Sequence, residues 1–172
     1  AAAYANDEAV AGFTMALEAA GRSAAGAAPK VVAVLAERRG DIRALIGEYE
    51  AALADYRSAI EYYLTQLKED GESPASAGQR AVVGTVAIKM ARLHSFQGQI
   101  DPARQKLALA FKYLPSDSPD ISSAWSLKAA SYIWDTDIPA AAEAGKRALQ
   151  IAREQGSFLQ LGEAYQALTH PA

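Results

Sequence analysis

Residues 47–60, GEYEAALADYRSAI, contain a pattern that returns at 98–111 (GQIDPARQKLALAF) and 136–149 (TDIPAAAEAGKRAL). Each copy starts with a turn residue and has an apolar residue two positions later. Alanines follow five and twelve positions after the start, and a large apolar residue follows the second alanine. Each copy therefore predicts a helix that packs through one small-residue face. The six alanines are Ala52 and Ala59, Ala103 and Ala110, and Ala141 and Ala148.

The segments that precede these copies also align with one another. Each has a small residue at one position, and a second shared position three residues later holds a ring or a long side chain. Two antiparallel helices approach closely where small side chains face each other, and a ring beside the contact fills the remaining gap. We therefore expect both sets to be packing positions. The small residues are Gly40, Ala91, Ala129 and Gly162, and the later ones are Arg43, His94, Tyr132 and Tyr165.

Helix-forming residues dominate the chain, and the alternating pattern of β-strands is almost absent. The one β-branched run, VVAVL at 31–35, continues into a helical pattern. Clusters of Gly, Pro, Ser and Asp predict loops at 21–30, 69–79 and 114–120, with shorter turns at Gly47, Gly98 and 136–139. The sequence thus predicts an all-α fold with helices of roughly 12 to 18 residues.

The bulk composition limits the class of protein. The chain has 172 residues, no cysteine and a net charge of −3. This predicts one domain with a core and no disulfides, and the lack of a basic field argues against nucleic acid as a direct ligand. No apolar run is long enough to cross a bilayer and no leader is visible, so we expect no membrane partner. The missing cysteines leave cytosol and periplasm open, and our prediction is cytoplasmic.

These motifs resemble the tetratricopeptide repeat (TPR) family. One unit carries the resemblance through Trp125, Ala129, Tyr132, Ala141 and Ala148, and another through Gly40, Gly47, Tyr49, Ala52, Tyr56 and Ala59; Pro115 closes a third unit. The resemblance implies an α-solenoid, a right-handed stack of antiparallel helix pairs. It divides a single domain, 1–172, into a partial repeat at 1–30, repeats at about 31–68, 80–115 and 120–154, and a terminal helix at 156–170.

The chain departs from the family pattern at several places. Spacings between equivalent small residues exceed the usual value of about 34 residues in the first two units, which predicts long inserted loops, chiefly at 66–80. Arg39 and Lys128 stand where the family usually has leucine, and Arg43 stands in a ring position. Both ends look like half-units, so we expect either a piece of a longer array or end-to-end self-association.

The resemblance also implies a concave groove, lined by the first helix of each unit, that holds a peptide. The alternative is an ordinary solvated helix face. The family's grip on a peptide carboxylate, made by lysine, asparagine and arginine, is missing, so we expect a ligand of mixed charge with an apolar or aromatic element. Phe96 and Trp134 either stand in the groove or rest on the next helix, whereas Trp125 is assigned to the core. The predicted partner-binding residues are Glu37, Arg38, Asp41, Leu45, Lys89, Arg92, Phe96, Leu127, Ala130, Trp134 and Glu163.

Residues suited to catalysis are few. The two histidines are His94, which we expect in the core between packed helices, and His170 at the chain end. No histidine spacing fits a metal site, and no glycine-rich loop fits a phosphate, so we expect neither an enzyme nor a cofactor. Turns and helix caps explain the loop aspartates better than paired-carboxylate chemistry does. These are Asp117, Asp120, Asp135 and Asp137.

The sequence therefore predicts a protein–protein interaction module. The first alternative is a structural or oligomerisation segment. The second is a regulatory repeat array, because repeats with such insertions resemble those fused to ATPase, cyclase or transcription-regulator modules in large bacterial signalling proteins.

Overall fold

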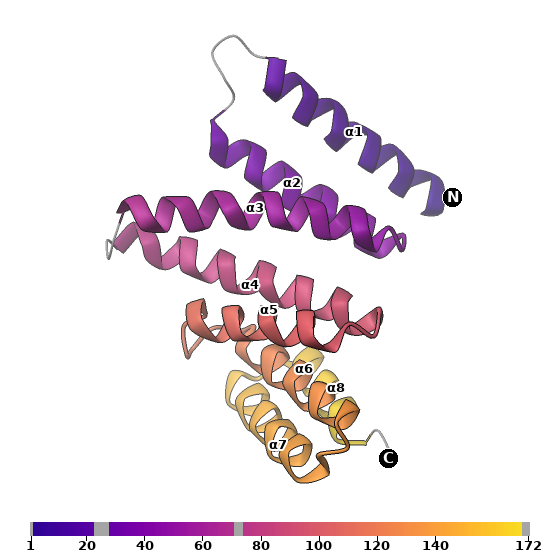
Figure 1. The fold of residues 1–172 in the computed structure, drawn as a ribbon, viewed down its shortest axis with the longest axis vertical. Coiled ribbons are helices and arrows are strands. Elements are labelled where there is room, and N and C mark those ends of the chain that lie inside the picture. Colours follow the sequence, from indigo (N-terminus) through magenta and orange to yellow (C-terminus); the bar gives the residue numbers. More distant parts are fainter. Residues whose placement is uncertain (1, 23–27, 71–73, 170–172) are drawn as a thin grey trace. The chain divides into compact units, whose positions relative to one another are not determined.

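The computed structural model describes residues 2–22, 28–70 and 74–169. The secondary-structure elements of this part are all α-helices, so the fold class is all-α as predicted (Figure 1). The 31–35 run lies inside a helix. The connecting segment before Ile121 is the loop predicted at 114–120. The helices are α1 (Ala2–Arg22), α2 (Pro29–Leu45), α3 (Tyr49–Asp70), α4 (Pro74–Phe96), α5 (Ile100–Tyr113), α6 (Ile121–Trp134), α7 (Ile138–Gln155) and α8 (Phe158–Thr169).

Three helices are longer than the predicted range. Helices α1, α3 and α4 have 21, 22 and 23 residues. The predicted inserted loop at 66–80 is wrong for the residues described there, because α3 continues to Asp70 and α4 begins at Pro74. Proline is well tolerated in the first turn of a helix, where its missing N–H leaves no bond unmade. Residues 71–73 lie outside the described part.

Contacts between Cα atoms divide the chain into two compact units, Ala1–Val82 and Val83–Ala172. In the first unit, α2 packs against both α1 and α3 (Figure 1). Gly40 of α2 is buried, and a Cβ atom there would lie 2.8 Å from a ring carbon of Tyr56 on α3. Gly40 is therefore a close-packing position, as predicted. Ala52 and Ala59 of α3 are also fully buried.

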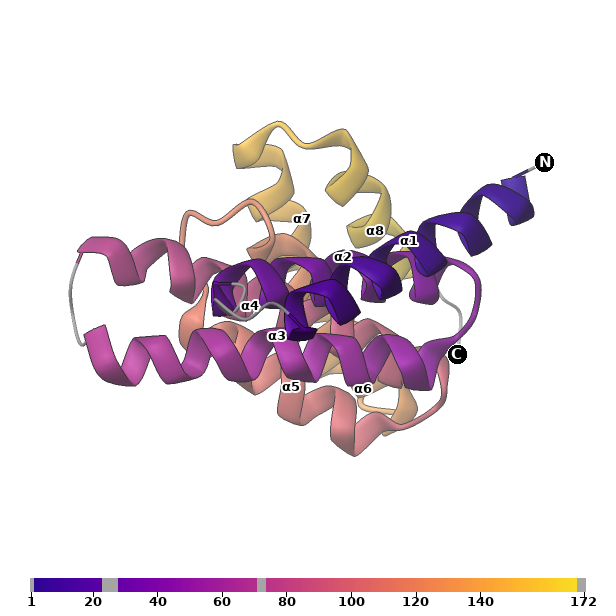
Figure 2. The ribbon, with the colours of Figure 1, turned by 90° about the horizontal axis from the view of Figure 1, so that it is seen from above.

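In the second unit, α6 packs against α5, α7 and α8. Helix α7 also packs against α8 (Figure 2). The predicted packing residues Ala91, Ala103, Ala110, Ala129, Ala141 and Ala148 are all buried. Gly162 is exposed, so its assignment as a packing residue is wrong. Helix α8 buries Gln160 and Ala164, four residues apart, and Gly162 points away from the face that they share.

Four connections share one backbone geometry. A residue with positive φ follows the helix at Gly47 (86°), Gly98 (70°), Thr136 (56°) and Gly156 (65°). The next residue's N–H then donates to a carbonyl five residues earlier, for example Glu48 to Arg43 at 2.8 Å and Gln99 to His94 at 2.8 Å. This is the Schellman arrangement, which satisfies carbonyls at the helix end. The turns predicted at 47, 98 and 136 are confirmed.

Candidate protein-binding surface

Three large apolar side chains are exposed at the ends of α2, α4 and α6. Leu45, Phe96 and Trp134 have relative exposures of 72%, 69% and 64%. Each stands two residues before the positive-φ residue of its turn. We refer to Leu45, Phe96 and Trp134 as the turn-edge residues. The two rings do not rest in the core, which was the alternative for Phe96 and Trp134.

In the second unit, Phe96 and Trp134 lie at one end of the packed helices. Arg104, in the first turns of α5, donates to the Ser131 carbonyl at 2.7 Å and to the Asp135 carboxylate. This contact holds the start of α5, which follows Phe96 through a short turn, against the end of α6, where Trp134 stands. The contact therefore brings the segment that follows Phe96 close to the helix end that carries Trp134.

The same end of the second unit is acidic. Asp101 lies in the first turn of α5 and its side chain is 89% exposed. Asp137 is also exposed and accepts a hydrogen bond from the Ala140 N–H at 3.1 Å, so it caps α7 as predicted for the loop aspartates. Asp135 also lies at this end, where Arg104 pairs with both Asp135 and Asp101 and offsets part of the negative charge.

Two of the predicted partner-binding residues bind each other. Arg92 of α4 and Glu163 of α8 form an ion pair at 3.0 Å, with side chains 40% and 27% exposed. The second oxygen of Glu163 accepts a hydrogen bond from the Ser123 hydroxyl of α6 at 2.7 Å. The structure thus joins α4, α6 and α8 through the side chains predicted to face a peptide. Lys89, Leu127 and Ala130 are half-buried.

The predicted residues of the first unit are partly engaged. Asp41 accepts a hydrogen bond from the Tyr56 hydroxyl at 2.9 Å and lies 3.8 Å from exposed Arg38. Burial, and next the charge of Asp41, raise the pKa of Tyr56 above its ordinary value. Glu37 is half-buried. Among the predicted partner residues of this unit, Arg38 and Leu45 are therefore the exposed ones.

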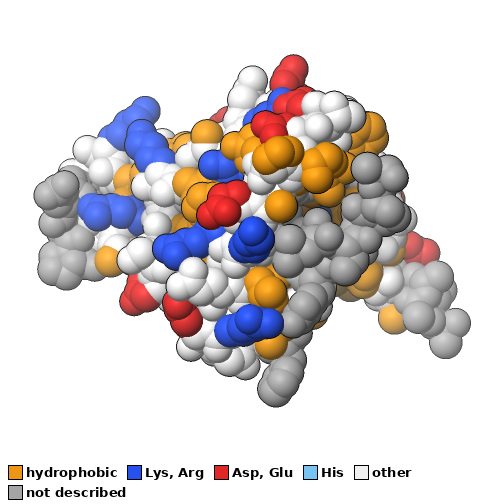
Figure 3. Space-filling view, turned by 90° about the horizontal axis from the view of Figure 1, so that it is seen from below, with side chains coloured by type: hydrophobic (Ala, Val, Ile, Leu, Met, Phe, Trp, Pro, Cys, Tyr) orange, Lys and Arg blue, Asp and Glu red, His pale blue; other side chains and the backbone are white. Residues whose placement is uncertain are grey.

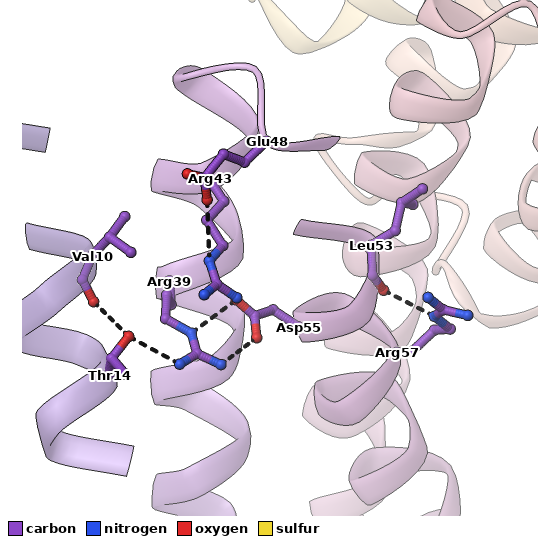
Figure 4. Close-up of polar contacts among 8 residues, drawn as sticks. All are labelled: Val10, Thr14, Arg39, Arg43, Glu48, Leu53, Asp55 and Arg57. Carbon is purple, nitrogen blue, oxygen red and sulfur yellow. Dashed lines mark hydrogen bonds and ion pairs between the residues drawn. The ribbon is translucent and has the colours of Figure 1, made fainter. Parts of the chain in front are cut away.

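The arginines that depart from the family pattern have a buried partner that sequence reasoning missed (Figure 4). Arg39 donates to both oxygens of Asp55, at 2.6 and 3.0 Å, and Arg43 donates to one of them at 2.9 Å. Arg39 also donates to the Thr14 hydroxyl of α1 at 3.1 Å. Asp55 is 4% exposed, so a single carboxylate connects two arginines of α2 to α3. A signal was present in the sequence: the two arginines stand where the resembled family usually has leucine and an aromatic ring.

Trp125 and His94 are less buried than predicted. Trp125 is half-buried and packs edge-on against Phe111, with ring centroids 5.0 Å apart. His94 is half-buried near the end of α4, where its Nδ1 lies 2.6 Å from the Gln99 side-chain oxygen. The turn beyond α4 thus gives His94 a polar partner in place of a core position. His170 lies outside the described residues.

The remaining loop aspartates act separately. Asp120 accepts from the Thr85 hydroxyl at 2.5 Å and makes no side-chain cap on α6, while Asp117 is exposed. Within the described ranges, no three His, Asp or Glu side chains come together as a metal site would need.

Charge on one face of the molecule is dispersed. Figure 3 shows Lys and Arg side chains (blue) mostly standing apart, with apolar (orange) and acidic (red) side chains among them. Of the helices in the described part of the chain, none has both the length and the apolar character for a bilayer crossing.

Comparisons with known proteins give a fold and no family. No family model matches the chain, and no curated protein matches it in sequence. Among solved structures, it is similar to BtubC (BKLC) from P. vanneervenii, with a TM-score of 0.62 and 20% sequence identity. The match covers 90% of this chain and 63% of that one. The likeness at this identity is one of fold alone, and the chain spans less than two thirds of BtubC.

Proposed function

We propose that this chain is a helical-repeat module that binds a protein or peptide partner, in the cytoplasm. In this proposal α2 with α3, α4 with α5, and α6 with α7 form antiparallel pairs of the tetratricopeptide type, stacked as a solenoid. Helices α1 and α8 are half-units. The recurring turn geometry and the buried alanines at equivalent positions support this arrangement. The fold likeness to BtubC agrees with it.

The observation that carries the function is the exposure of Leu45, Phe96 and Trp134. Monomeric proteins expose many single apolar residues, so exposure by itself means little. Here, however, large apolar side chains stand exposed at the same position of three repeats, each beside a turn fixed by backbone hydrogen bonds. Large aromatic side chains held on a rigid backbone are frequent anchors in protein interfaces. We therefore assign partner binding to the turn-edge residues.

The charges near the two rings define the expected partner. Asp101, Asp135 and Asp137 lie at the same end of the second unit as Phe96 and Trp134. A complementary segment carries an apolar or aromatic residue with a basic residue beside it. The half-buried groove residues Arg92 and Glu163 satisfy each other and contribute less, so the ligand need not match them.

Peptide display on the immobilised chain tests this function. We expect the native chain to enrich peptides with an apolar or aromatic residue next to Lys or Arg. The double variant Phe96→Ala, Trp134→Ala should lose the enrichment, because removing an anchor residue from an interface weakens binding by about 2 kcal/mol or more, roughly thirtyfold.

Met15→Ala is the matched control. Met15 is 65% exposed, but it lies on α1, which carries none of the turn-edge residues, so this variant should enrich the same peptides as the native chain. Equal enrichment by the native chain and the double variant would remove the turn-edge residues from the proposal. No enrichment by the native chain would contradict peptide binding and favour self-association.

A further inference from the structure

Lys128 is a cation at a position that a buried methionine, Met90, occupies in α4. It directly precedes the buried small residue Ala129, as Met90 precedes Ala91 in α4 and Arg39 precedes Gly40 in α2. Met90 is 1% exposed, which shows that this position belongs to the core of a repeat. The charge of Arg39 is compensated by the Asp55 carboxylate, to which it donates a hydrogen bond at 2.6 Å.

No such partner serves Lys128. In the part of the chain that the structure describes, Lys128 makes no ion pair. Its ammonium instead lies 4.8 Å from the ring centroid of Trp125 and 5.4 Å from that of Phe111. An ammonium is attracted to ring faces, but a carboxylate provides the stronger, charge-assisted contact. The charge is therefore held in place without an anion.

A cavity opens beside this ammonium. It lies between α5 and α6 within the second unit and has a volume of about 200 Å³. Leu107 and Phe111 supply apolar walls, while Arg104, Ser131 and Tyr132 line it together with Lys128. None of its lining residues in the described part of the chain is acidic. The space suits a small apolar group.

The other polar groups at the cavity are mostly engaged. Arg104 donates to the Ser131 carbonyl and to Asp135, and the Ser131 hydroxyl donates to the Lys128 carbonyl at 2.8 Å. This leaves Lys128 as the cation whose charge is not matched by a carboxylate within the chain.

We propose that this cavity binds a ligand that joins a carboxylate to a small aromatic or branched apolar group. The carboxylate pairs with the Lys128 ammonium, and the apolar group contacts Leu107 and Phe111. A small free acid and the carboxy-terminal residue of a peptide share this chemistry. The site is distinct from the turn-edge residues and does not depend on them.

NMR titration of the full chain with phenylacetate tests the proposal, with the neutral phenylacetamide as its control. We expect saturable shifts of the Lys128, Ser131 and Tyr132 amides with the acid. The amide should bind at least about tenfold more weakly, because it loses the charge-assisted bond. Binding of the two compounds with equal affinity, or no shift with the acid, would overturn the proposal.

Lys128→Met is the decisive variant, because methionine is the residue that α4 uses at the equivalent position. It removes the charge at nearly constant length, and we expect it to fold and to lose the acid selectively. Lys128→Gln provides a second, polar variant if the methionine variant does not fold. Acid binding by either folded variant with native affinity would contradict the role of Lys128.

Two further experiments are needed. One distinguishes a small free acid from a peptide end as the ligand, and the other distinguishes this cavity from the turn-edge residues. A short peptide ending in a phenylalanine carboxylate, compared with its amidated form, shows whether a peptide end binds more tightly than the free acid. The Phe96→Ala, Trp134→Ala variant should still bind phenylacetate. Loss of phenylacetate in that variant would contradict the separation of the two sites.

Discussion

Asp55 carries one negative charge between two arginines inside the first unit. Its side chain is 5% exposed, and those of Arg39 and Arg43 are 17% and 20% exposed. Removing three charges from water is costly, and their mutual attraction offsets that cost only while the geometry is intact. The group is therefore sensitive to the loss of any single member.

We expect Asp55→Ala to lower the free energy of unfolding by about 3–5 kcal/mol, because it leaves two largely buried guanidinium groups without their carboxylate. Asp101→Ala is the control, since Asp101 is exposed and its pair with Arg104 is 3.9 Å long; it should change stability by less than about 1 kcal/mol. Urea denaturation followed by circular dichroism measures both. Equal effects would show that the buried carboxylate has no special role.

Replacing all three charged residues together should lower the free energy of unfolding much less than removing Asp55 alone. The triple variant Arg39→Met, Arg43→Tyr, Asp55→Ala takes its residues from the equivalent positions Met90, Tyr132 and Ala144. Apolar replacement of a buried ionic group is often neutral or stabilising, by about 1–4 kcal/mol. The same urea denaturation measures the triple variant. A lower free energy of unfolding for the triple variant than for Asp55→Ala would contradict this expectation.

The sequence alone shows that Arg39 and Arg43 are out of pattern but not what they bind. Asp55 is 16 and 12 residues away from them, on the next helix, and its identity as their partner depends on side-chain directions. Lys128 illustrates the same limit. Its position is visible in the alignment, whereas the cavity beside it depends on how α5 and α6 pack.

Between helices, the repeated turn requires a residue with positive φ, and its four copies meet this requirement unequally. Gly47 and Gly98 adopt it freely, whereas Thr136 is β-branched and adopts φ of 56°. A left-handed conformation costs a residue with a side chain roughly 1–2 kcal/mol. The turn after α6 is therefore the strained one.

Opposite effects are expected from substitutions in two of these turns. Thr136→Gly should raise the unfolding free energy by about 1 kcal/mol and Gly98→Ala should lower it by a similar amount. Gly78→Ala serves as the control: Gly78 is an exposed glycine inside α4, where alanine is the better helix former by about 1 kcal/mol. Thermal denaturation of the three variants checks the signs. Stabilisation by Gly98→Ala would contradict the assigned turn geometry.

Helix positions and turns were predictable because alanine spacing and turn residues are local features. The helix boundaries around 66–80 were not predictable from local features. Pro74, Gly78 and neighbouring small residues predict a loop by composition, but the stretch from Pro74 onward is helix α4, in which Ser76 is buried. Tertiary packing outweighs the propensity penalty of about 1 kcal/mol for a glycine within a helix.

At the scale of the whole chain, the alternative to a binding module is a segment that assembles with its own copies. Beyond the turn edges, the exposed large apolar side chains that the structure describes include Met15, Val31, Val34 and Leu159. These residues come from three different helices, α1, α2 and α8. Scattered apolar residues of this kind are common on monomers.

We therefore expect sedimentation velocity to show a monomer over a hundredfold range of protein concentration. Leu159→Ala and Met15→Ala should leave the sedimentation coefficient unchanged. A dimer that forms with rising concentration and is weakened by either variant would favour the oligomerisation segment and count against a simple binding module.

The long-range pairing of Arg92 with Glu163 was beyond sequence reasoning. The two residues are 71 positions apart, and both were placed on one binding face by the resemblance. That they bind each other, with Ser123 beside them, depends on how closely α8 approaches α4 and α6. Local patterns do not encode this distance.

The repeated turn also has a consequence for how such a chain can change over time. Its hydrogen bonds are made by backbone groups, and the bond to a carbonyl five residues earlier forms whether leucine, phenylalanine or tryptophan stands two positions before the positive-φ residue. Mutation at Leu45, Phe96 or Trp134 can therefore alter what the surface offers while leaving the helix ends intact. The same freedom makes these three positions natural sites for a randomised library in which new specificities are selected on an unchanged framework.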